Sequence, residues 1–105
     1  MRFRIWQSSD YAITAMGYKP NAEMACVWDA SGVEHDLHDT DGSMKILGRI
    51  FHDFQRVDEN HMPPEEYKGR SLSVGDVVQI ERDTGATEWW AVEPVGWKEI
   101  EGIHP

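Results

Sequence analysis

The sequence predicts a single α+β domain in which one amphipathic helix packs against a small antiparallel sheet. A chain of 105 residues that is 40% hydrophobic has the size and the apolar content of one compact domain. One segment repeats its apolar residues with helical spacing, whereas several β-prone runs are separated by turn-forming residues. Because no second segment has a clear crossover-helix pattern, the strands are expected to pair antiparallel.

The predicted sheet begins with the first residues of the sequence, where apolar and polar side chains alternate. Phe3 and Ile5 fall on one face, as in a half-buried strand. Residues 24–29 are also β-prone, and the turn-forming residues 30–32 after them predict a hairpin with residues 33–37. This part of the chain is therefore expected to contribute three strands.

The principal helix is predicted over residues 43–57, where apolar residues recur at intervals of three and four. The residues of this apolar stripe are Leu47, Ile50, Phe51, Phe54 and Val57. The stripe is expected to be buried against the sheet, with both Phe51 and Phe54 in the core. One residue of the run Asp39 to Asp41 is expected to cap the exposed N–H groups at the start of the helix.

A second hairpin is predicted to complete the sheet. The double proline at residues 63–64 ends helical structure, because proline lacks the N–H that a helix interior needs. Two β-prone runs follow at residues 72–82 and 87–95, separated by a turn signal at residues 83–86. Residues 101–105 are expected to form a loose tail.

The charge of the chain limits its binding partners. Ten basic and nineteen acidic residues give a net charge of −9, which opposes association with nucleic-acid phosphates. The sequence contains no apolar run long enough to span a membrane and no signal-peptide pattern. With a single cysteine and therefore no intrachain disulfide, the expected location is the cytoplasm, which would be that of the host cell for a phage-encoded protein.

No pattern of reactive side chains points to catalysis. Residues 34–41 gather histidines and carboxylates, but their spacing does not match a zinc or calcium site, so no metal and no cofactor are expected. No nucleophile stands at a recognisable spacing from a base, and no phosphate-binding loop is present, which argues against an enzyme. Cys26 lies between apolar neighbours in a predicted strand and is expected to be buried and unreactive.

The strongest local motif is Gly-Arg-Ser-Leu-Ser-Val-Gly-Asp-Val-Val at residues 69–78. The residues in it with expected structural roles are Ser71, Ser73, Gly75 and Asp76. The serines can bond the backbone as the chain enters a strand, the glycine suits a bulge or a positive φ, and the aspartate can accept backbone N–H bonds. Arg70 is expected to pair with Asp76 or with a helix carboxylate such as Asp53.

Together with its flanking segments, this motif resembles the YodL-like family of small bacterial, plasmid and phage proteins, whose core reads Arg-Ser-x-Ser-Val-x-Asp-Val. In that family the motif precedes an aromatic strand ending in Gly-Phe, which corresponds here to residues 89–92 and to Gly96 with Trp97 in place of phenylalanine. The resemblance covers residues 47–100 and implies the family's fold for that part. The family has no settled biochemical activity, although some members are linked to interference with host cell machinery.

The five tryptophans of the chain suggest a binding surface, because tryptophan is enriched in interface hot spots. Trp89 and Trp90 are adjacent in a predicted strand, so their side chains should point to opposite faces. One helix covers only one face of a small sheet, so at least one of these indoles is expected to be partly exposed unless the N-terminal segment covers the second face. The candidate binding residues are Trp89, Trp90, Trp97 and Arg70.

These observations favour a non-enzymatic protein-interaction module, from a phage or mobile element, that binds a host or partner protein. One alternative is an acidic DNA mimic that inhibits a restriction, CRISPR or other DNA-binding enzyme, which requires carboxylates arranged in a stripe at about the phosphate spacing. A second alternative is a small nucleic-acid-binding barrel that uses Arg2, Arg4, Arg70 and exposed tryptophans, although the net charge argues against it. The sequence leaves the oligomeric state open, a dimer included.

Overall fold

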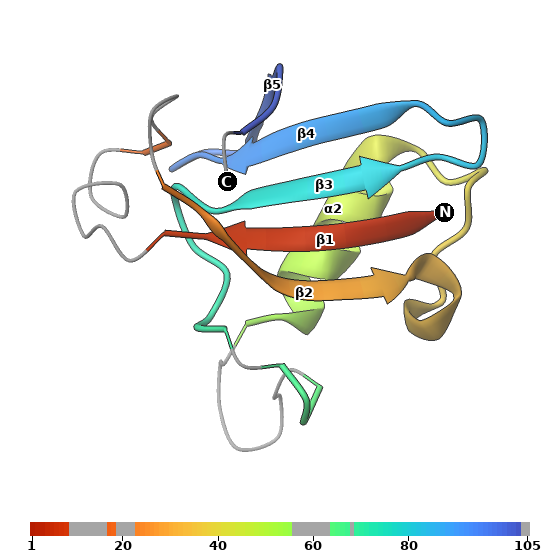
Figure 1. Cartoon of the computed structure of the whole chain (residues 1–105), viewed down its shortest axis with the longest axis horizontal. Coiled ribbons are helices and arrows are strands. Elements are labelled where there is room, and N and C mark those ends of the chain that lie inside the picture. Colours follow the sequence, from red (N-terminus) through yellow and green to blue (C-terminus); the bar gives the residue numbers. More distant parts are fainter. Residues whose placement is uncertain (9–16, 19–22, 56–63, 68, 104–105) are drawn as a thin grey trace.

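Five strands form one antiparallel sheet, and an α-helix crosses one of its faces (Figure 1). The structure is a computed structural model, which describes residues 1–8, 17–18, 23–55, 64–67 and 69–103. In chain order the elements are β1 (Arg2–Gln7), β2 (Ala25–Ser31), the 3-10 helix η1 (Gly32–His35), α2 (Ser43–Asp53), β3 (Val77–Glu81), β4 (Thr87–Val92) and β5 (Trp97–Ile100). The coarse prediction of an antiparallel sheet with one principal helix is therefore confirmed.

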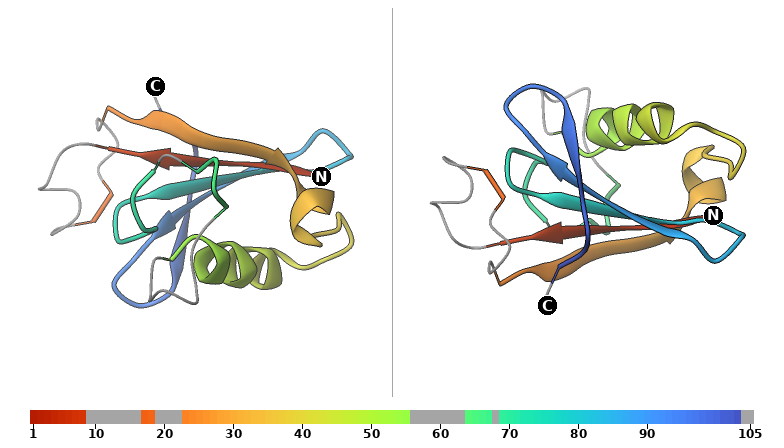
Figure 2. Two further views of the ribbon diagram at one scale, coloured as in Figure 1. Left: turned by 90° about the horizontal axis from the view of Figure 1, so that it is seen from below. Right: turned by 90° about the horizontal axis from the view of Figure 1, so that it is seen from above.

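The strand order is β2-β1-β3-β4-β5, and all neighbouring strands are antiparallel. The chain leaves β2 at one edge, passes through η1 and α2 on one side of the sheet, and re-enters beside β1 as β3. Both views in Figure 2 show η1 and α2 on the same side. We call this side the helix face and the opposite side, which Figure 1 shows in front, the open face.

The main core lies between the helix face and α2. The fully buried side chains from the strands are Phe3, Ile5, Val78 and Ile80, and those from the helix and its end are Ile46, Leu47, Ile50 and Phe54. Alternation along β1 places Phe3 and Ile5 on this face, as predicted from the sequence. A smaller buried cluster on the open face contains Met24, Val77, Ala91 and Ile103.

The predicted return strand at residues 33–37 is wrong. β2 pairs along its length with β1, and the chain after it turns into η1, where Val33 is 69% exposed. Asp36 adopts the left-handed conformation with φ of 56°, which lets the chain turn back towards the sheet. Leu37 is then buried in the main core. Of the two apolar residues that suggested a strand here, Val33 is exposed and only Leu37 is buried.

The helix is shorter than predicted, and its apolar stripe is narrower. α2 ends at Asp53, and the predicted extension reaches residues 56–57, which lie outside the described part of the chain. Phe54 is fully buried, but Phe51 is 36% exposed, so the prediction that both phenylalanines are in the core is wrong. Phe51 lies at the margin of the stripe, where its ring meets Trp97 at the end of the sheet.

The predicted side-chain cap of α2 is also wrong. The N-cap residue is Gly42, which makes no side-chain hydrogen bond to the helix. The carboxylate of Asp41 instead accepts the backbone N–H of His38 at 2.9 Å, and that of Asp39 accepts the N–H of Asp83 at 2.9 Å. Both acids therefore shape the loop before the helix and its contact with the β3–β4 turn.

The second hairpin is confirmed, with shorter strands than predicted. β3 begins at Val77 instead of residue 72, because residues 73–76 form a turn in which the Asp76 N–H donates to the Ser73 carbonyl at 3.0 Å. β4 ends at Val92, and a tight turn leads into the additional edge strand β5. The predicted loose tail is wrong for Ile103, which is only 8% exposed.

Candidate functional site

A bidentate ion pair between Arg70 and Asp76 lies where the chain approaches the start of β3. Arg70 Nη1 and Nη2 each lie 2.8 Å from one carboxylate oxygen of Asp76. The Ser73 N–H and the Gln7 amide also donate to Asp76 Oδ2, at 2.8 and 3.1 Å. Asp76 is fully buried, whereas the Arg70 side chain is 39% exposed. The motif therefore places its aspartate at the centre of a polar cluster.

Gln7, at the end of β1, joins this cluster to the preceding segment. Its amide oxygen accepts the Arg70 N–H at 3.1 Å, and its amide nitrogen donates to the Arg70 carbonyl at 2.9 Å and to the Tyr67 hydroxyl at 3.0 Å. The Tyr67 hydroxyl donates to the same carbonyl at 2.6 Å. Sequence reasoning missed Gln7, because a polar residue at a strand end carries no signal of burial. The interior strand β1 thus holds the motif in place.

The geometry assigns a structural role to the motif. Burial raises the pKa of Asp76, while the hydrogen bonds from Arg70 and Ser73 act in the opposite direction. Gly75 has φ of 93°, and Asp76 accepts a backbone N–H, as the motif predicts. The Ser73 hydroxyl accepts from Arg70 instead of bonding the backbone, and Ser71 is half-buried. Arg70, a predicted binding residue, therefore directs its charge into the protein.

The predicted tryptophans divide between the two faces of the sheet. Trp89 lies on the open face, with its ring centroid 6.2 Å from that of Trp6, and belongs to the small cluster there. Trp90 lies on the helix face at the margin of the main core and donates from its indole to Glu88 at 3.0 Å. Both indoles are half-buried, which agrees with the predicted opposite orientations and partial exposure. Because the two indoles lie on opposite faces of the sheet, they do not form one surface.

An apolar surface lies on the helix face at the end of the sheet, and we call its residues Phe51, Pro94, Val95 and Trp97 the docking patch. Phe51 and Trp97 meet edge to face at 6.1 Å, and with Pro94 they line a hollow of about 290 Å³. Val95, at the tip of the β4–β5 turn, is 93% exposed. Gly96 next to it has φ of 76°, which permits this tight turn. The patch thus holds one predicted binding residue, Trp97.

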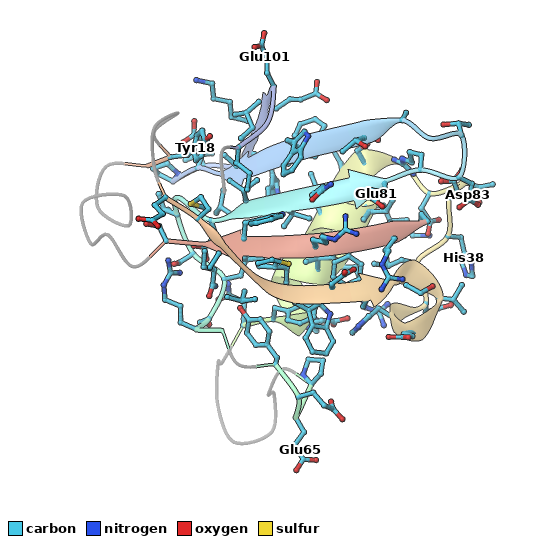
Figure 3. All side chains as sticks on the ribbon, in the orientation of Figure 1. Tyr18, His38, Glu65, Glu81, Asp83 and Glu101 are labelled. Atoms are coloured by element: carbon cyan, nitrogen blue, oxygen red, sulfur yellow. The ribbon has the colours of Figure 1, made fainter. Side chains whose placement is uncertain are left out.

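A second and larger hollow lies on the open face beside β5. It has a volume of about 680 Å³ and is lined by Tyr18, Trp89 and residues 98–103. The Tyr18 hydroxyl donates to the Gly102 carbonyl at 3.2 Å and so closes one end. Figure 3 shows the Glu101 side chain pointing away from the molecule beyond β5. Tyr18 and the returning segment therefore cover part of the open face and leave a groove next to Trp89.

The arginines considered for nucleic-acid stacking are engaged with carboxylates. Arg2 lies 2.6 Å from Asp29, and Arg4 pairs with Asp29 at 3.1 Å and with Glu81. Glu81 lies on the open face in Figure 3, in the same row of the sheet as Arg2. Because both guanidinium groups are already paired, the open face presents neutralised charge in place of a basic surface.

The remaining candidates carry no reactive geometry. Cys26 is exposed, contrary to prediction, because it lies opposite Trp6 on an edge strand and faces away from the main core. Burial of part of its surface raises the pKa of the thiol, which lowers its reactivity. Among the described residues, no group of three or more His, Cys, Asp or Glu side chains is placed to hold a metal ion. In the same part of the chain no helix is long and apolar enough to cross a membrane.

Two parts of the candidate site had weak sequence signals. Phe51 has the same helical spacing as the core residues of α2, and only its position at the margin of the apolar stripe distinguishes it from them. β5 is short and follows Pro94 and Gly96, which argue against a strand in the sequence. Val95 lies between Pro94 and Gly96 in the sequence, and this position in a turn was the one indication that an apolar side chain would be exposed.

Comparison with known proteins extends the similarity over most of the chain. The family model described as YodL-like domain matches residues 2–102, which includes β1, β2 and α2 as well as the C-terminal half. No curated protein and no solved structure matches the chain.

Proposed function

Since the chain belongs to the YodL-like domain family, we propose that it is a non-enzymatic interaction module, encoded by a phage or another mobile element, which binds or modulates a host protein. The docking patch is the binding surface in this proposal. The origin in a mobile element rests on the family resemblance, whereas the interaction rests on the exposed apolar side chains.

The observation that carries the proposal is an apolar hollow lined by Phe51 and Trp97, with the exposed Val95 on the adjoining turn. Among the described residues, the exposed large apolar side chains are Val33, Met44, Phe51 and Val95. Phe51 and Val95 belong to the docking patch, and Met44 lies two helical turns before Phe51 on the same flank of α2. Contiguous apolar surface with an aromatic side chain at its centre is typical of protein-binding sites.

The patch is suited to binding because Pro94 and Val95 are exposed, while Trp97 is anchored against the main core. Fully burying an exposed Val or Phe side chain contributes roughly 1.5 to 3 kcal/mol, so a partner that covers Val95, which is 93% exposed, and the 36% of Phe51 that is exposed gains about 2 to 4 kcal/mol. Trp97 is half-buried and held by the ring of Phe51, so little side-chain entropy is lost when a partner covers it. These contacts support a pre-organised site.

The test is affinity capture from a lysate of the host with matched apolar-to-polar variants. Val95→Ser and Trp97→Ala remove parts of the docking patch, whereas Val33→Ser removes another largely exposed valine from η1, outside the patch. The proposal expects one specific protein to be recovered by the wild type and by Val33→Ser, with recovery reduced about tenfold or more by either patch variant. Circular dichroism on each variant confirms that it is folded.

Two results would contradict the proposal. The first is recovery of no specific protein by the wild-type chain. The second is recovery of a DNA-binding enzyme that both patch variants retain but that is lost when Glu93, Glu99 and Glu101 are changed to glutamine, because this pattern supports the acidic DNA mimic.

A further inference from the structure

The edge strand β5 pairs on one side only among the described residues, and it runs between two hollows. In the β4–β5 turn the Glu93 N–H donates to the Gly96 carbonyl at 3.1 Å, so these two residues form a hydrogen-bonded pair. Bonded and non-bonded pairs alternate along antiparallel strands, which directs the backbone groups of Lys98 and Ile100 towards β4. The N–H and C=O groups of Trp97 and Glu99 therefore point outwards.

The bonds of β4 on its other side agree with this assignment. Val92, which lies opposite Trp97, uses its N–H for the Asp76 carbonyl at 2.8 Å and its C=O for the Gly75 N–H at 3.0 Å. Its backbone is thus turned away from β5. Figure 2, right, shows β5 crossing in front of the other strands at the end of the sheet, with its outer edge uncovered by any other described element.

The two edges of the sheet differ in their fitness to accept another strand. The register of β2 with β1 shifts between Ile5 and Trp6, and such an irregularity protects an edge from pairing. β5 is only four residues long and carries Lys98, but it pairs with β4 in a regular register without a bulge. An incoming strand is therefore favoured at β5.

Both faces beside β5 provide space for the side chains of an added strand. Successive side chains of such a strand point to opposite faces, so one set enters the hollow of the docking patch and the other enters the groove beside Trp89. Trp97 and Glu99 project on the helix face, and Lys98 and Ile100 project on the open face. The hollows are on opposite sides of one strand, as strand addition requires.

The charge around β5 indicates the chemistry of the occupant. Glu93 lines the hollow on the helix face, and Glu99 stands beside Trp97 on that face. A long basic side chain there can cover Phe51 and Trp97 with its apolar stem while its charge reaches these carboxylates. On the open face the groove is also lined by Lys98 and Glu101, whose opposite charges offset each other, while Trp89 and Ile100 provide the contacts for an apolar side chain.

We propose that β5 binds an extended segment of a partner protein by strand addition, and that this segment alternates basic residues facing the helix side with apolar residues facing the open side. The proposal rests on the proposed function and specifies its partner. A second copy of this chain is a less suitable occupant, because each copy carries a net charge of −9.

The test uses a synthetic peptide of alternating arginine and valine, with an alternating glutamate and valine peptide as the charge control. Two further arginine–valine peptides carry backbone N-methyl groups, one on every arginine and the other on every valine. Strand addition uses the N–H groups of only one set, so one methylated peptide should bind about tenfold or more weakly and the other nearly as well as the parent. In the complex, the amide protons of Trp97 and Glu99 should exchange more slowly with solvent.

Two variants of the same residue separate backbone pairing from charge. Glu99→Pro removes an outward N–H without removing a bond to β4, whereas Glu99→Gln removes the charge and keeps the N–H. The proposal expects Glu99→Pro to abolish peptide binding and Glu99→Gln to weaken it only a few-fold. Hydrogen exchange at Lys98 and Ile100 shows that the β4–β5 ladder survives in both.

Several outcomes would overturn the proposal. The first is that the arginine–valine peptide does not bind. The second is that the two methylated peptides lose affinity to the same extent, and the third is that the Glu99→Pro variant still binds the peptide. A dimer of the chain alone that Glu99→Pro disperses would assign the edge to a second copy. Host-protein capture that depends on Trp97 but tolerates Glu99→Pro would leave the proposed function in place and reject strand addition alone.

Discussion

A single buried carboxylate organises the segment that leads into β3. Asp76 is fully buried and depends on Arg70, Ser73 and Gln7 for its hydrogen bonds. Removing one member of a buried ion pair is costly because it leaves the other charge without a partner. The raised pKa of Asp76 means that the folded state holds a proton on this group more readily than the unfolded state does.

We predict that Arg70→Met lowers the free energy of unfolding by about 3 kcal/mol at pH 7, since Asp76 is then buried without its cation. Loss of Arg70 raises the pKa of Asp76 further. Between that pKa and the unfolded value, the folded state binds more protons, so its stability increases as the pH falls. The difference between variant and wild type should therefore shrink from pH 7 towards pH 4 in urea denaturation.

The matched control for this prediction is Arg49→Met. Arg49 makes an exposed i,i+4 pair with Asp53 at 2.9 Å, which contributes at most about 0.5 kcal/mol. Its loss should change stability little at either pH. An Arg70→Met deficit that stays constant or grows as the pH falls would show that Asp76 is not the group responsible.

Glycine is required at position 69 because a larger side chain has no space there, and not because the backbone has a positive φ. A Cβ at this position would collide with the Tyr67 hydroxyl and with Oε1 of Gln7, both of which are fixed by hydrogen bonds. We predict that Gly69→Ala destabilises the protein by about 1 to 3 kcal/mol, as overpacking does. In contrast, Gly48 on α2 has open space around it, and Gly48→Ala should stabilise the protein by about 0.5 to 1 kcal/mol. Thermal denaturation of both variants provides the comparison.

At the scale of elements, α2 shows how two phenylalanines on one predicted stripe divide between core and surface. Phe54 contacts the rings of Phe3, Trp28 and Tyr67 at centroid distances between 4.9 and 6.1 Å. Phe51 instead lies at the edge of the sheet beside Trp97. The first is therefore needed for folding, and the second is available for binding.

We predict that Phe54→Ala lowers the free energy of unfolding by about 3 to 5 kcal/mol, the usual cost of a large cavity in a core. Phe51→Ala should cost about 1 kcal/mol or less, because its side chain is 36% exposed, and it should reduce capture of the partner. Denaturant titration of the two variants decides between these roles. Equal destabilisation would mean that the docking patch belongs to the core.

The same elements show what the sequence could and could not predict. Alternation in β1, the turn between β3 and β4, and the spacing in α2 are local patterns, and each predicted its element correctly. The pairing of β2 with β1 depends on contacts between distant segments, which no local pattern encodes. β5 pairs locally with β4, but its four residues follow Pro94 and Gly96 and give only a weak strand pattern. For the site, the sequence offered Asp76 or a helix carboxylate such as Asp53 as the partner of Arg70, and the structure shows Asp76. The contributions of Gln7 and Phe51 depend on tertiary packing and had no clear sequence pattern.

At the scale of the whole molecule, the two faces of the sheet are covered to different extents. The helix face is covered by α2 and the large core, whereas the described residues that cover the open face are a few from the β1–β2 connection and from the segment after β5. Met24 and Tyr18 approach from the N-terminal side, and Ile103 approaches from the C-terminal side. The groove beside Trp89 exists because this second layer is incomplete.

We predict that Ile103→Ala opens this second layer while the sheet and α2 remain folded. Ile103 is 8% exposed and packs with Val77 and Ala91, so its truncation should lower the free energy of unfolding by about 2 kcal/mol, the lower end of the range for buried isoleucine. The Trp89 indole should become more accessible to solvent and the Tyr18 hydroxyl should lose its bond to Gly102. Faster hydrogen exchange at Gly102, with unchanged exchange in β1 and β3, is the expected result. Global loss of protection would instead show that the small cluster is essential to the whole fold, because the sheet could not then survive on its helix face alone.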